Sequence, residues 1–523
     1  MKTYYDIHCH IFNKDVVIRR LVNVVQSLVA LKNLVEGEFS EADVKLKIEG
    51  INNTLGEVTQ ETSEEVFNIL DNVYNKEVVV TPLMFDLTYA DDNDDEINKN
   101  RRYSNRIEFV LKTAARLMFI VKLKIKNKEL KESLKPVKKN LLEFAHLFDK
   151  PTKKEIEIFD NSNYEQQIED LEALSKKNER VKPFFSVDPR REYKAKDVIM
   201  NLVKDKVAGT DARFAGIKLY APAGFSPTDP VLMGSDTDEG LYGFCQRNKI
   251  PITVHNSNGG FACLSKDLRV NGHVYLDRKI RYLNSKKHTF KENFFGIRAG
   301  KAIGERAKTL NHPALWNLVM NKFPELVINF AHFGGSDQIM EYVNYQIPEK
   351  MEIKTLDKYM KNFSKDYKNL IDSIYKRKRK YMYLQKDFRF EDRKKIWNIM
   401  YHAGLIDNWA KAIFEIVRNV NYPNAYTDLS CFSEGKLIDL AGDNSTDQVF
   451  TIKYELENFK RNFFNQISAY EKSKILYGSD FFLAQFFGPT MKQYYSDFKE
   501  VFGSDFDIIA HEKNAERFLN ITT

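Results

Sequence analysis

Cysteine, long apolar runs and glycine-rich phosphate loops are scarce or missing in this chain of 523 residues. The four cysteines are scattered and form no Cys-x-x-Cys pair, which argues against both a disulfide framework and a cysteine-based zinc site. No window approaches the ~18 uninterrupted apolar residues of a membrane helix, and the first twelve residues lack the basic-then-apolar pattern of a signal peptide. No GxxxxGK(S/T) or GxGxxG loop is present, so nucleotide-binding folds lose support. We therefore expect a cytoplasmic protein without a membrane segment.

Positive charge is concentrated in two segments. The net charge of +7 comes from 80 Lys and Arg against 73 Asp and Glu. Lys99 to Lys139 holds 14 basic and 3 acidic residues, and Lys350 to Lys395 holds 16 basic and 7 acidic residues. These segments contribute +11 and +9, so the rest of the chain carries −13. A Lys-rich helical stretch is usually a solvated face, and the alternative is a surface for nucleic acid or an acidic partner.

Eight short apolar, β-branched runs recur along the chain, each followed by polar or turn-like residues and then a helical pattern. Such alternation indicates parallel strands in βα units, and eight units suggest a TIM-like (β/α)8 barrel of the α/β class. An open, doubly wound sheet is the main alternative. The predicted strands are Tyr5–His8, Glu77–Leu83, Val181–Val187, Phe214–Leu219, Ile252–His255, Leu326–Ala331, Ala425–Leu429 and Ile475–Tyr477.

Large insertions are expected within this single domain of residues 1–523. A minimal barrel uses about 250 residues, so roughly half of the chain must lie outside it. Polar sequence that we interpret as mainly helical fills residues 19–75, 98–177, 264–311 and 338–422. Each insertion follows a predicted strand and would leave from the catalytic face of a barrel, where it can form a helical cap or subdomain.

The strongest local motif is Asp6-Ile7-His8-Cys9-His10 near the start of the chain. Residues two apart on a strand point to the same side, so His8 and His10 can face one point at the strand end. Cys9 should point to the opposite face and pack in the core. Two converging imidazoles suit a divalent metal such as zinc.

Three later strands also end in residues that can bind a metal. The fifth ends at His255, the sixth at His332, and the eighth runs into Asp480. The ends of barrel strands form the catalytic face, so these side chains are expected to converge there with the first motif. A carboxylate at the close of a buried strand is costly without a metal, an arginine or several donors.

This pattern resembles the amidohydrolase superfamily of metal-dependent barrel enzymes. Within it, the chain is similar to the amidohydrolase-related group that includes aminocarboxymuconate-semialdehyde decarboxylase and γ-resorcylate decarboxylase. The resemblance covers all the predicted strands but not the insertions. The stretches that carry it are Asn311-His312-Pro313, Trp316, Phe323-Pro324, Ala331-His332-Phe333-Gly334-Gly335, Tyr477-Gly478-Ser479-Asp480 and Asn514–Leu519.

The resemblance implies metal ligands at His8, His10, His255 and Asp480, with Asp480 also acting in catalysis. It implies a catalytic role beside the metal for His332 in a one-metal form, or a ligand role in a two-metal form. Lys218 stands where some members carry a carboxylated lysine that bridges two metals. We favour one metal per chain over two, with zinc expected and manganese as the alternative.

The metal suggests hydrolysis. Bound zinc can lower the pKa of its water from 15.7 to about 7 and polarise a carbonyl oxygen. Asp480 would accept a proton and pass it on, while His332 would stabilise developing charge. We predict a hydrolase acting on a C–N, ester or related bond of a small molecule. One alternative is a decarboxylase on the same scaffold. The other is a binding or assembly module whose basic insertions engage nucleic acid or a protein partner. The resemblance also implies that a homodimer is possible.

Further polar residues near strand ends are candidates for substrate contact. Arg190 and Arg298 carry the fork of donors that suits a carboxylate or phosphate, and Asn256 directly follows a predicted ligand. For each of them the alternative is a structural salt bridge or turn cap. The same two interpretations hold for Asp86, Asp188 and Asp428.

Overall fold

The computed structural model describes part of the chain. The described residues are 2–11, 45, 48, 52, 62–86, 88–90, 127–146, 161–192, 197–235, 239–292, 299–346, 351–352, 381–382, 390–432, 452–481 and 490–520.

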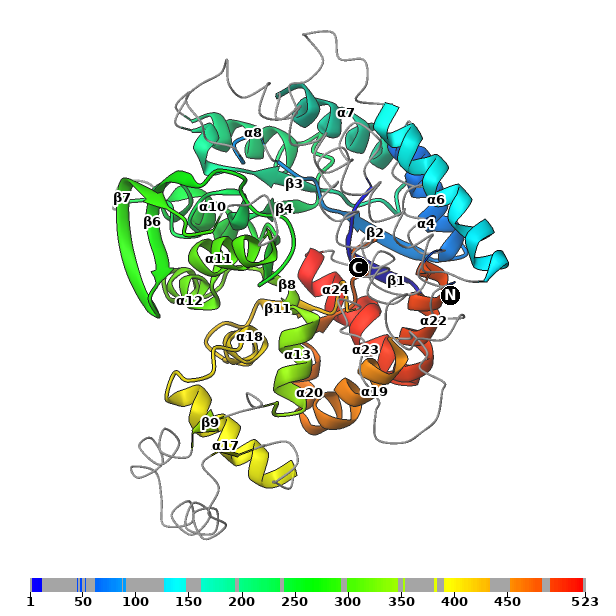
Figure 1. Cartoon of the computed structure of the whole chain (residues 1–523). Coiled ribbons are helices and arrows are strands. Elements are labelled where there is room, and N and C mark those ends of the chain that lie inside the picture. Colours follow the sequence, from blue (N-terminus) through cyan, green and yellow to red (C-terminus); the bar gives the residue numbers. More distant parts are fainter. Residues whose placement is uncertain are drawn as a thin grey trace.

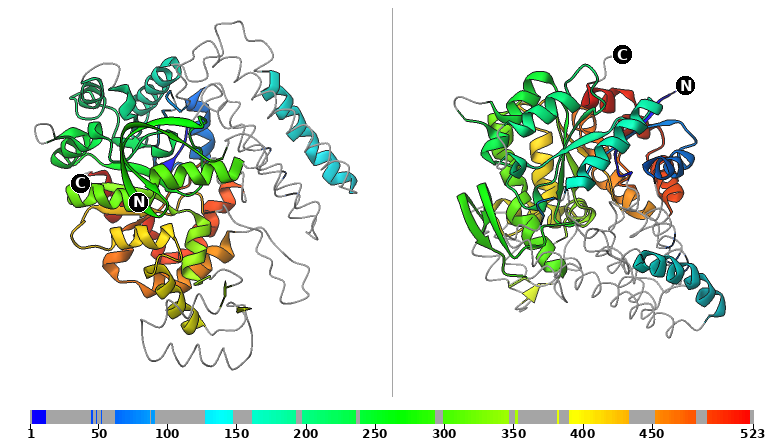
Figure 2. Two further views of the ribbon diagram at one scale, coloured as in Figure 1. Left: turned by 60° about the vertical axis from the view of Figure 1, so that its left-hand side comes forward. Right: turned by 90° about the horizontal axis from the view of Figure 1, so that it is seen from above.

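All eight predicted runs contain a β-strand. Figures 1 and 2 show these strands in the interior with helices around them (Figure 1, Figure 2). The strands are β1 (Tyr4–Cys9), β2 (Val78–Pro82), β3 (Phe184–Val187), β4 (Gly216–Leu219), β5 (Ile252–Ser257), β8 (Ile328–Gly334), β11 (Ala425–Asp428) and β12 (Ile475–Leu476). The strand prediction is therefore confirmed.

These strands form two parallel sheets. One sheet has six strands in the order β12-β11-β8-β5-β4-β3, and the other pairs β1 with β2. Isolated parallel bridges join Val80 to Val181 and Leu83 to Phe184, which brings β2 beside β3. On the other side, the Ile7 N–H donates to the Tyr477 carbonyl over 3.2 Å. The ladders alone do not form one closed barrel among the described residues, because β1 has an irregular register and β12 is only two residues long.

Helices connect and cover the strands. They are α4 (Ser63–Val73), α6 (Lys128–His146), α7 (Asn161–Lys177), α8 (Val198–Lys206), α9 (Pro230–Met233), α10 (Gly240–Asn248), α11 (Ala299–Asn311), α12 (Pro313–Lys322), α13 (Ser336–Val343), α17 (Phe390–His402), α18 (Trp409–Val417), α19 (Lys453–Asn462), α20 (Ala469–Lys472), α22 (Met491–Phe502), α23 (Phe506–Ala510) and α24 (Glu512–Leu519). Short 3-10 turns are η2 (Pro189–Arg191), η3 (Ala221–Ala223), η4 (Phe464–Gln466) and η5 (Gly503–Asp505). No described helix has an eighteen-residue stretch apolar enough to cross a bilayer.

Local sequence explains several helix starts. Thr62 and Glu65 form a capping box at α4, in which each side chain accepts from the other residue's backbone N–H. His312 caps α12 through the Ala314 N–H, and Pro313 takes the first helical position, where a missing N–H costs nothing. Helix α12 buries Trp316 completely.

An apolar layer and then a polar layer lie along the strands. Eight apolar side chains on the strands or directly next to them pack together with three from α24; they are Tyr5, Ile7, Val79, Leu83, Phe184, Val327, Tyr426, Leu476, Ala515, Phe518 and Leu519. Two positions beyond Phe184 and Val327 along their strands stand the buried polar residues Ser186 and Asn329. Lys218 on β4 and Thr253 on β5 lie between them, each paired in register with its neighbour across β3, β4, β5 and β8. The four polar side chains therefore form one row on the same face of the sheet. The polar row lies toward the ends of the strands, where the predicted site is expected.

The insertion at residues 264–311 is not mainly helical. Residues 267–289 form an antiparallel hairpin of β6 (Asp267–Leu276) and β7 (Lys279–Thr289), at the edge of the molecule in Figure 1, and only then does α11 begin. The helix prediction is wrong here because Leu268, Val270 and Val274 alternate with less buried residues at a strand period. The turn between the strands, Asp277-Arg278, has positive φ at both residues, as a two-residue hairpin turn requires.

The other three insertions are described only in part. Helix α4 lies in residues 19–75, helices α6 and α7 in 98–177, and α13, α17 and α18 wholly or partly in 338–422. The last insertion also contains a short antiparallel pair, β9 (Met351–Glu352) with β10 (Tyr381–Met382). Most of the basic segments 99–139 and 350–395 lies outside the described residues, so the partner predictions attached to them stay predictions.

A buried carboxyl group between α13 and α19 predicts a pH-dependent stability. Burial, and then the charge of Asp337, raise the pKa of Glu455 from its ordinary value of 4.5 to about 7. The folded protein therefore binds more protons than the unfolded chain between about pH 4.5 and 7, and stability falls as the pH rises through that window. We expect Glu455→Gln to stabilise the protein by about 2–3 kcal/mol at pH 8 and to flatten this decline. Urea unfolding at pH 5 and pH 8 measures both effects, and an equal decline in both proteins would contradict the prediction.

Candidate metal centre

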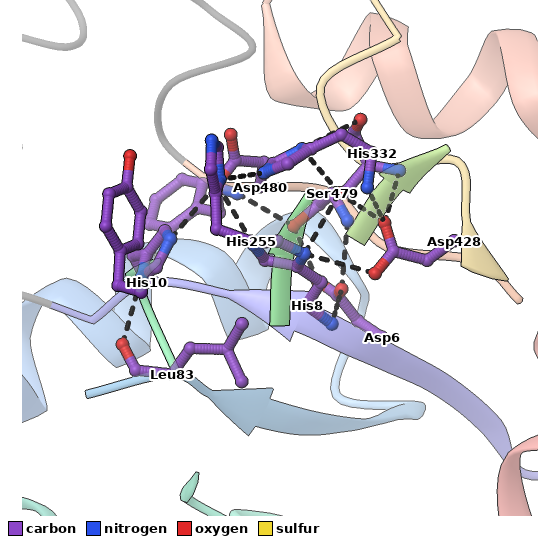
Figure 3. Close-up of polar contacts among 12 residues, drawn as sticks. Asp6, His8, His10, Leu83, His255, His332, Asp428, Ser479 and Asp480 are labelled. Carbon is purple, nitrogen blue, oxygen red and sulfur yellow. Dashed lines mark hydrogen bonds and ion pairs between the residues drawn. The ribbon is translucent and has the colours of Figure 1, made fainter. Parts of the chain in front are cut away.

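Two histidines at the end of β1 point their Nε2 atoms at one carboxylate (Figure 3). His8 Nε2 lies 3.5 Å and His10 Nε2 3.2 Å from Oδ1 of Asp480, and all three side chains are almost fully buried. The other ring nitrogen of His10, Nδ1, lies 2.9 Å from the Leu83 carbonyl oxygen. Because a carbonyl can only accept, His10 carries a hydrogen on Nδ1, and its Nε2 is the atom that faces Asp480.

The end of β12 delivers Asp480 to this point. The Asp480 N–H donates to the His8 carbonyl over 2.7 Å, and the Asp480 backbone has a φ of 50°. Gly478 makes the approach of the two segments feasible, since a Cβ at that position would lie 2.7 Å from the Cβ of His8. The glycine of the Tyr477-Gly478-Ser479-Asp480 motif is therefore required by close packing against β1.

Substitution of that glycine is expected to disturb the centre. Gly478→Ala should push the new methyl group against His8 and Ser430, at a cost of about 1–3 kcal/mol in stability and with weaker metal binding. The matched control is Gly300→Ala in α11, where a Cβ meets no atom within 4 Å. Thermal unfolding and metal titration of both variants measure the effect. Equal behaviour of the two variants would show that the close approach is unimportant.

These three residues pass a geometric test for a metal. Ligand atoms about 2.1 Å from a tetrahedral zinc ion are roughly 3.4 Å from one another, and the two observed contacts to Asp480 are 3.5 and 3.2 Å. His8, His10 and Asp480 form one group whose potential ligand atoms all lie within 4.8 Å of one another. Neither His8 Nε2 nor Asp480 Oδ1 has a hydrogen bond within the described residues, although both are buried. Buried polar atoms rarely stay unsatisfied in proteins, so a cation fits this arrangement.

Electrostatics keep the carboxylate charged. Burial alone would raise the pKa of Asp480, but contact with His10 and the neighbouring imidazoles of His332 and His8 lower it well below its usual range. Asp480 is therefore an anion at neutral pH. A charged oxygen beside two imidazole nitrogens is a donor set suited to zinc.

His255 and His332 form a second, connected pair. His332 Nε2 lies 3.0 Å from His255 Nδ1, and His255 Nε2 lies 3.0 Å from the Gly259 carbonyl oxygen. Since that carbonyl can only accept, His255 is protonated on Nε2 and accepts from His332 on Nδ1. Burial, and then the charge of His8, lower the pKa of His332 to about 4; burial and then His332 lower the pKa of His255 well below its usual value. Both rings are therefore neutral at pH 7.

The structure brings the predicted site residues together unequally. His8, His10 and Asp480 converge directly, whereas the predicted ligand His255 makes its closest polar contacts with His332 and Gly259. His332 joins a second group with His8 and Asp428 that satisfies the same 4.8 Å spacing. Lys218 is buried in the polar row, and its charge helps to lower the pKa values of both His255 and His332, so it lies near this pair.

The predicted substrate residues have different surroundings. Arg190 Nε and Nη2 donate to the two carboxylate oxygens of Asp188 over 2.9 and 2.6 Å, and Nη1 donates to the Tyr89 carbonyl. Its guanidinium group is thus held within the protein. Asn256 is buried, with no hydrogen bond to its side-chain amide among the described residues. Arg298 lies outside the described residues.

Sequence reasoning missed the residues that surround the histidines. Tyr220 stacks on His255 with ring centroids 4.4 Å apart, and Phe85 packs edge-on against Tyr220. Asp428, considered as a substrate contact or as a structural salt bridge or turn cap, is fully buried against His8. Its position at the close of the run Ala425–Asp428 was a usable signal, since a buried strand rarely ends in a carboxylate without donors.

No family model matches this sequence, and no curated protein matches it significantly. Among solved structures, a crystal structure described as "Amidohydrorolase II" matches with 11% sequence identity over 70% of this chain and 80% of that one, at a TM-score of 0.33. So low a TM-score gives this likeness no weight beside the geometry of the centre.

Proposed function

We propose that the chain is a metal-dependent hydrolase of the amidohydrolase type, built on one (β/α)8 barrel. The bridges from β2 to β3 and the hydrogen bond from Ile7 to Tyr477 support a barrel in which β1 lies between β2 and β12. The observation that carries the function is the buried convergence of His8 Nε2, His10 Nε2 and Asp480 Oδ1 at tetrahedral ligand spacing.

His8, His10 and Asp480 would hold the metal. His255, the predicted fourth ligand, would have to exchange its contact with His332 for the metal, because its one lone pair, on Nδ1, faces His332. Zinc is the first choice because two imidazoles and a carboxylate match its usual ligands, and manganese is the second. One metal per chain is proposed. A second would require Lys218 as a carboxylated bridge.

The chemistry follows from the residues around that ion. When bound, a divalent ion would lower the pKa of a coordinated water toward about 7 and polarise a substrate carbonyl. Asp480, an anion at neutral pH, is proposed to accept a proton on its carboxylate and return it to the leaving group. Neutral His332 carries its hydrogen on Nε2, and it is proposed to turn this N–H from His255 toward charge that develops on the attacked oxygen. The rings of Phe85 and Tyr220 beside His10 and His255 would exclude water and favour a substrate with an apolar part.

The test combines metal content with product analysis. Protein is stripped with a chelator, reloaded with zinc or manganese, and assayed on aryl esters, lactones and amides, with CO2 release measured in parallel on aromatic carboxylic acids. About one metal per chain, with hydrolysis that returns only on reloading, supports the proposal. Metal-dependent CO2 release without hydrolysis favours the decarboxylase instead. If the chain retains no metal even when metal is supplied in excess, the proposal is wrong.

A further inference from the structure

The carboxylate of Asp428, at the end of β11, is surrounded by hydrogen-bond donors (Figure 3). Its Oδ2 lies 3.2 Å from His8 Nδ1 and accepts from Asn329 Nδ2 over 2.6 Å. Its Oδ1 accepts from the backbone N–H of His332 over 2.9 Å and of Ser430 over 3.0 Å, and also from the Ser430 hydroxyl. The side chain is fully buried, so every contact is made inside the protein.

This environment decides which nitrogen of His8 carries the hydrogen. An ionised carboxylate only accepts, so His8 must present an N–H from Nδ1 to Oδ2. The lone pair is then on Nε2, the atom that faces Asp480 and His10. The opposite tautomer would direct the Nδ1 lone pair at a negative oxygen and place a hydrogen where a metal ligand is needed.

We propose that Asp428 is the positioning residue of the centre: it selects the His8 tautomer that can bind a metal and holds His332 beside it. Asp428 holds His332 through a hydrogen bond from the His332 backbone N–H to Asp428 Oδ1. This bond stabilises a His332 backbone with a φ of 67°, which is strained for a residue other than glycine. One carboxylate thus links a proposed ligand with the proposed catalytic histidine. This inference rests on the proposed function, because it assigns Asp428 a task toward the same metal.

The variant Asp428→Asn separates this role from a merely structural one. The two backbone N–H groups facing Oδ1 cannot change into acceptors, so the oxygen of the new amide must face them. Its NH2 group then faces His8 and Asn329. Asn329 can adapt by turning its own amide, since its Oδ1 has no hydrogen bond within the described residues. His8 loses its charged acceptor on Nδ1 and meets an N–H donor there instead, and the acceptor that remains near Nδ1 is the Ser430 hydroxyl oxygen, 3.0 Å away. The new donor favours the tautomer that accepts on Nδ1, which moves the hydrogen to Nε2 and blocks the ligand atom.

We expect Asp428→Asn to bind metal 10–100-fold more weakly than the wild type, the range typical of residues that orient metal-bound histidines. Affinity is measured by competition of zinc with a chromophoric chelator and by the visible spectrum of the cobalt(II) form. The control is Asp71→Asn in α4. It removes the carboxylate of a different ion pair, the one with Arg180, away from the centre. Equal zinc affinity in the wild type and Asp428→Asn would overturn the inference.

Two further readouts keep the result unambiguous. If Asp428→Asn does not fold, the His8 tautomer is read in the wild type by NMR after 15N-histidine labelling: hydrogen on Nδ1 supports the inference, and hydrogen on Nε2 overturns it. If the wild type itself binds no metal, the proposed function fails and the inference with it. If the wild type binds metal and Asp428→Asn binds it equally well, only the positioning role fails.

Discussion

Asp480→Asn and His8→Ala are each expected to abolish stable metal binding. Asp480→Asn replaces the only carboxylate of the three-residue group with a neutral amide, and His8→Ala removes the imidazole shared by both candidate groups. Loss of a direct ligand should exceed the 10–100-fold effect of an orienting residue, so we expect at least about 100-fold weaker binding, or about 3 kcal/mol.

Metal content by plasma mass spectrometry measures this loss after gel filtration of each protein loaded with equimolar zinc. His402→Ala, which removes an exposed histidine at the end of α17, is the control for a lost imidazole. Asp205→Asn, whose side chain is 69% exposed, is the control for a lost carboxylate. If both ligand variants retain about one zinc per chain, the ion is bound elsewhere and the assignment of the centre is wrong.

Asp6→Ala is expected to cause the largest loss of stability. The buried Asp6 carboxylate accepts four hydrogen bonds: from the His8 N–H, the Ser479 N–H, the Ser479 hydroxyl and the Tyr74 hydroxyl, over 3.2, 2.9, 2.6 and 2.7 Å. These bonds join β1 to the segment after β12 and to the chain just beyond α4. An alanine would leave four buried donors without their acceptor, and we expect a loss of about 4–5 kcal/mol.

Urea unfolding measures this loss, and Tyr74→Phe calibrates it. That variant removes one of the four donors and should cost about 1–2 kcal/mol. Since domains are commonly stable by only about 5–15 kcal/mol, Asp6→Ala can leave little folded protein at 37 °C. A loss below about 1 kcal/mol would mean that water replaces the carboxylate and that Asp6 does not hold the ends of β1 and β12 together.

The strands were predictable because a buried strand needs little context. Runs such as Val78–Pro82 and Ile252–Ser257 are fully buried, so their apolar, β-branched composition is visible without knowledge of any partner. The hairpin of β6 and β7 was misjudged because β7 is almost entirely exposed and highly charged, which resembles a solvated helix. Alternation of buried and less buried side chains is clear only on β6, whose apolar side chains pack against neighbouring residues such as Phe290 and Leu310.

The centre was predictable to the same extent. His8, His10 and Asp480 lie at or shortly after the ends of parallel strands. Parallel strands deliver their last residues to one side of a sheet, so the convergence follows from position along the chain. The contact of His255 with His332, rather than with the group of three, depends on ring orientation and on the Gly259 carbonyl. Strand spacing does not determine either of these.

The order of the residues along the chain is enough to tell which of them end the strands, and therefore which side chains reach the polar end of the interior. What each polar atom faces depends on the packing of segments that are far apart in the chain. Asp428 lies 420 residues from His8 in the chain, and their contact exists because their strands flank β12 on either side. A period of two residues specifies a face, whereas the choice of hydrogen-bond partner, of histidine tautomer and of ligand atom depends on neighbours that packing brings together.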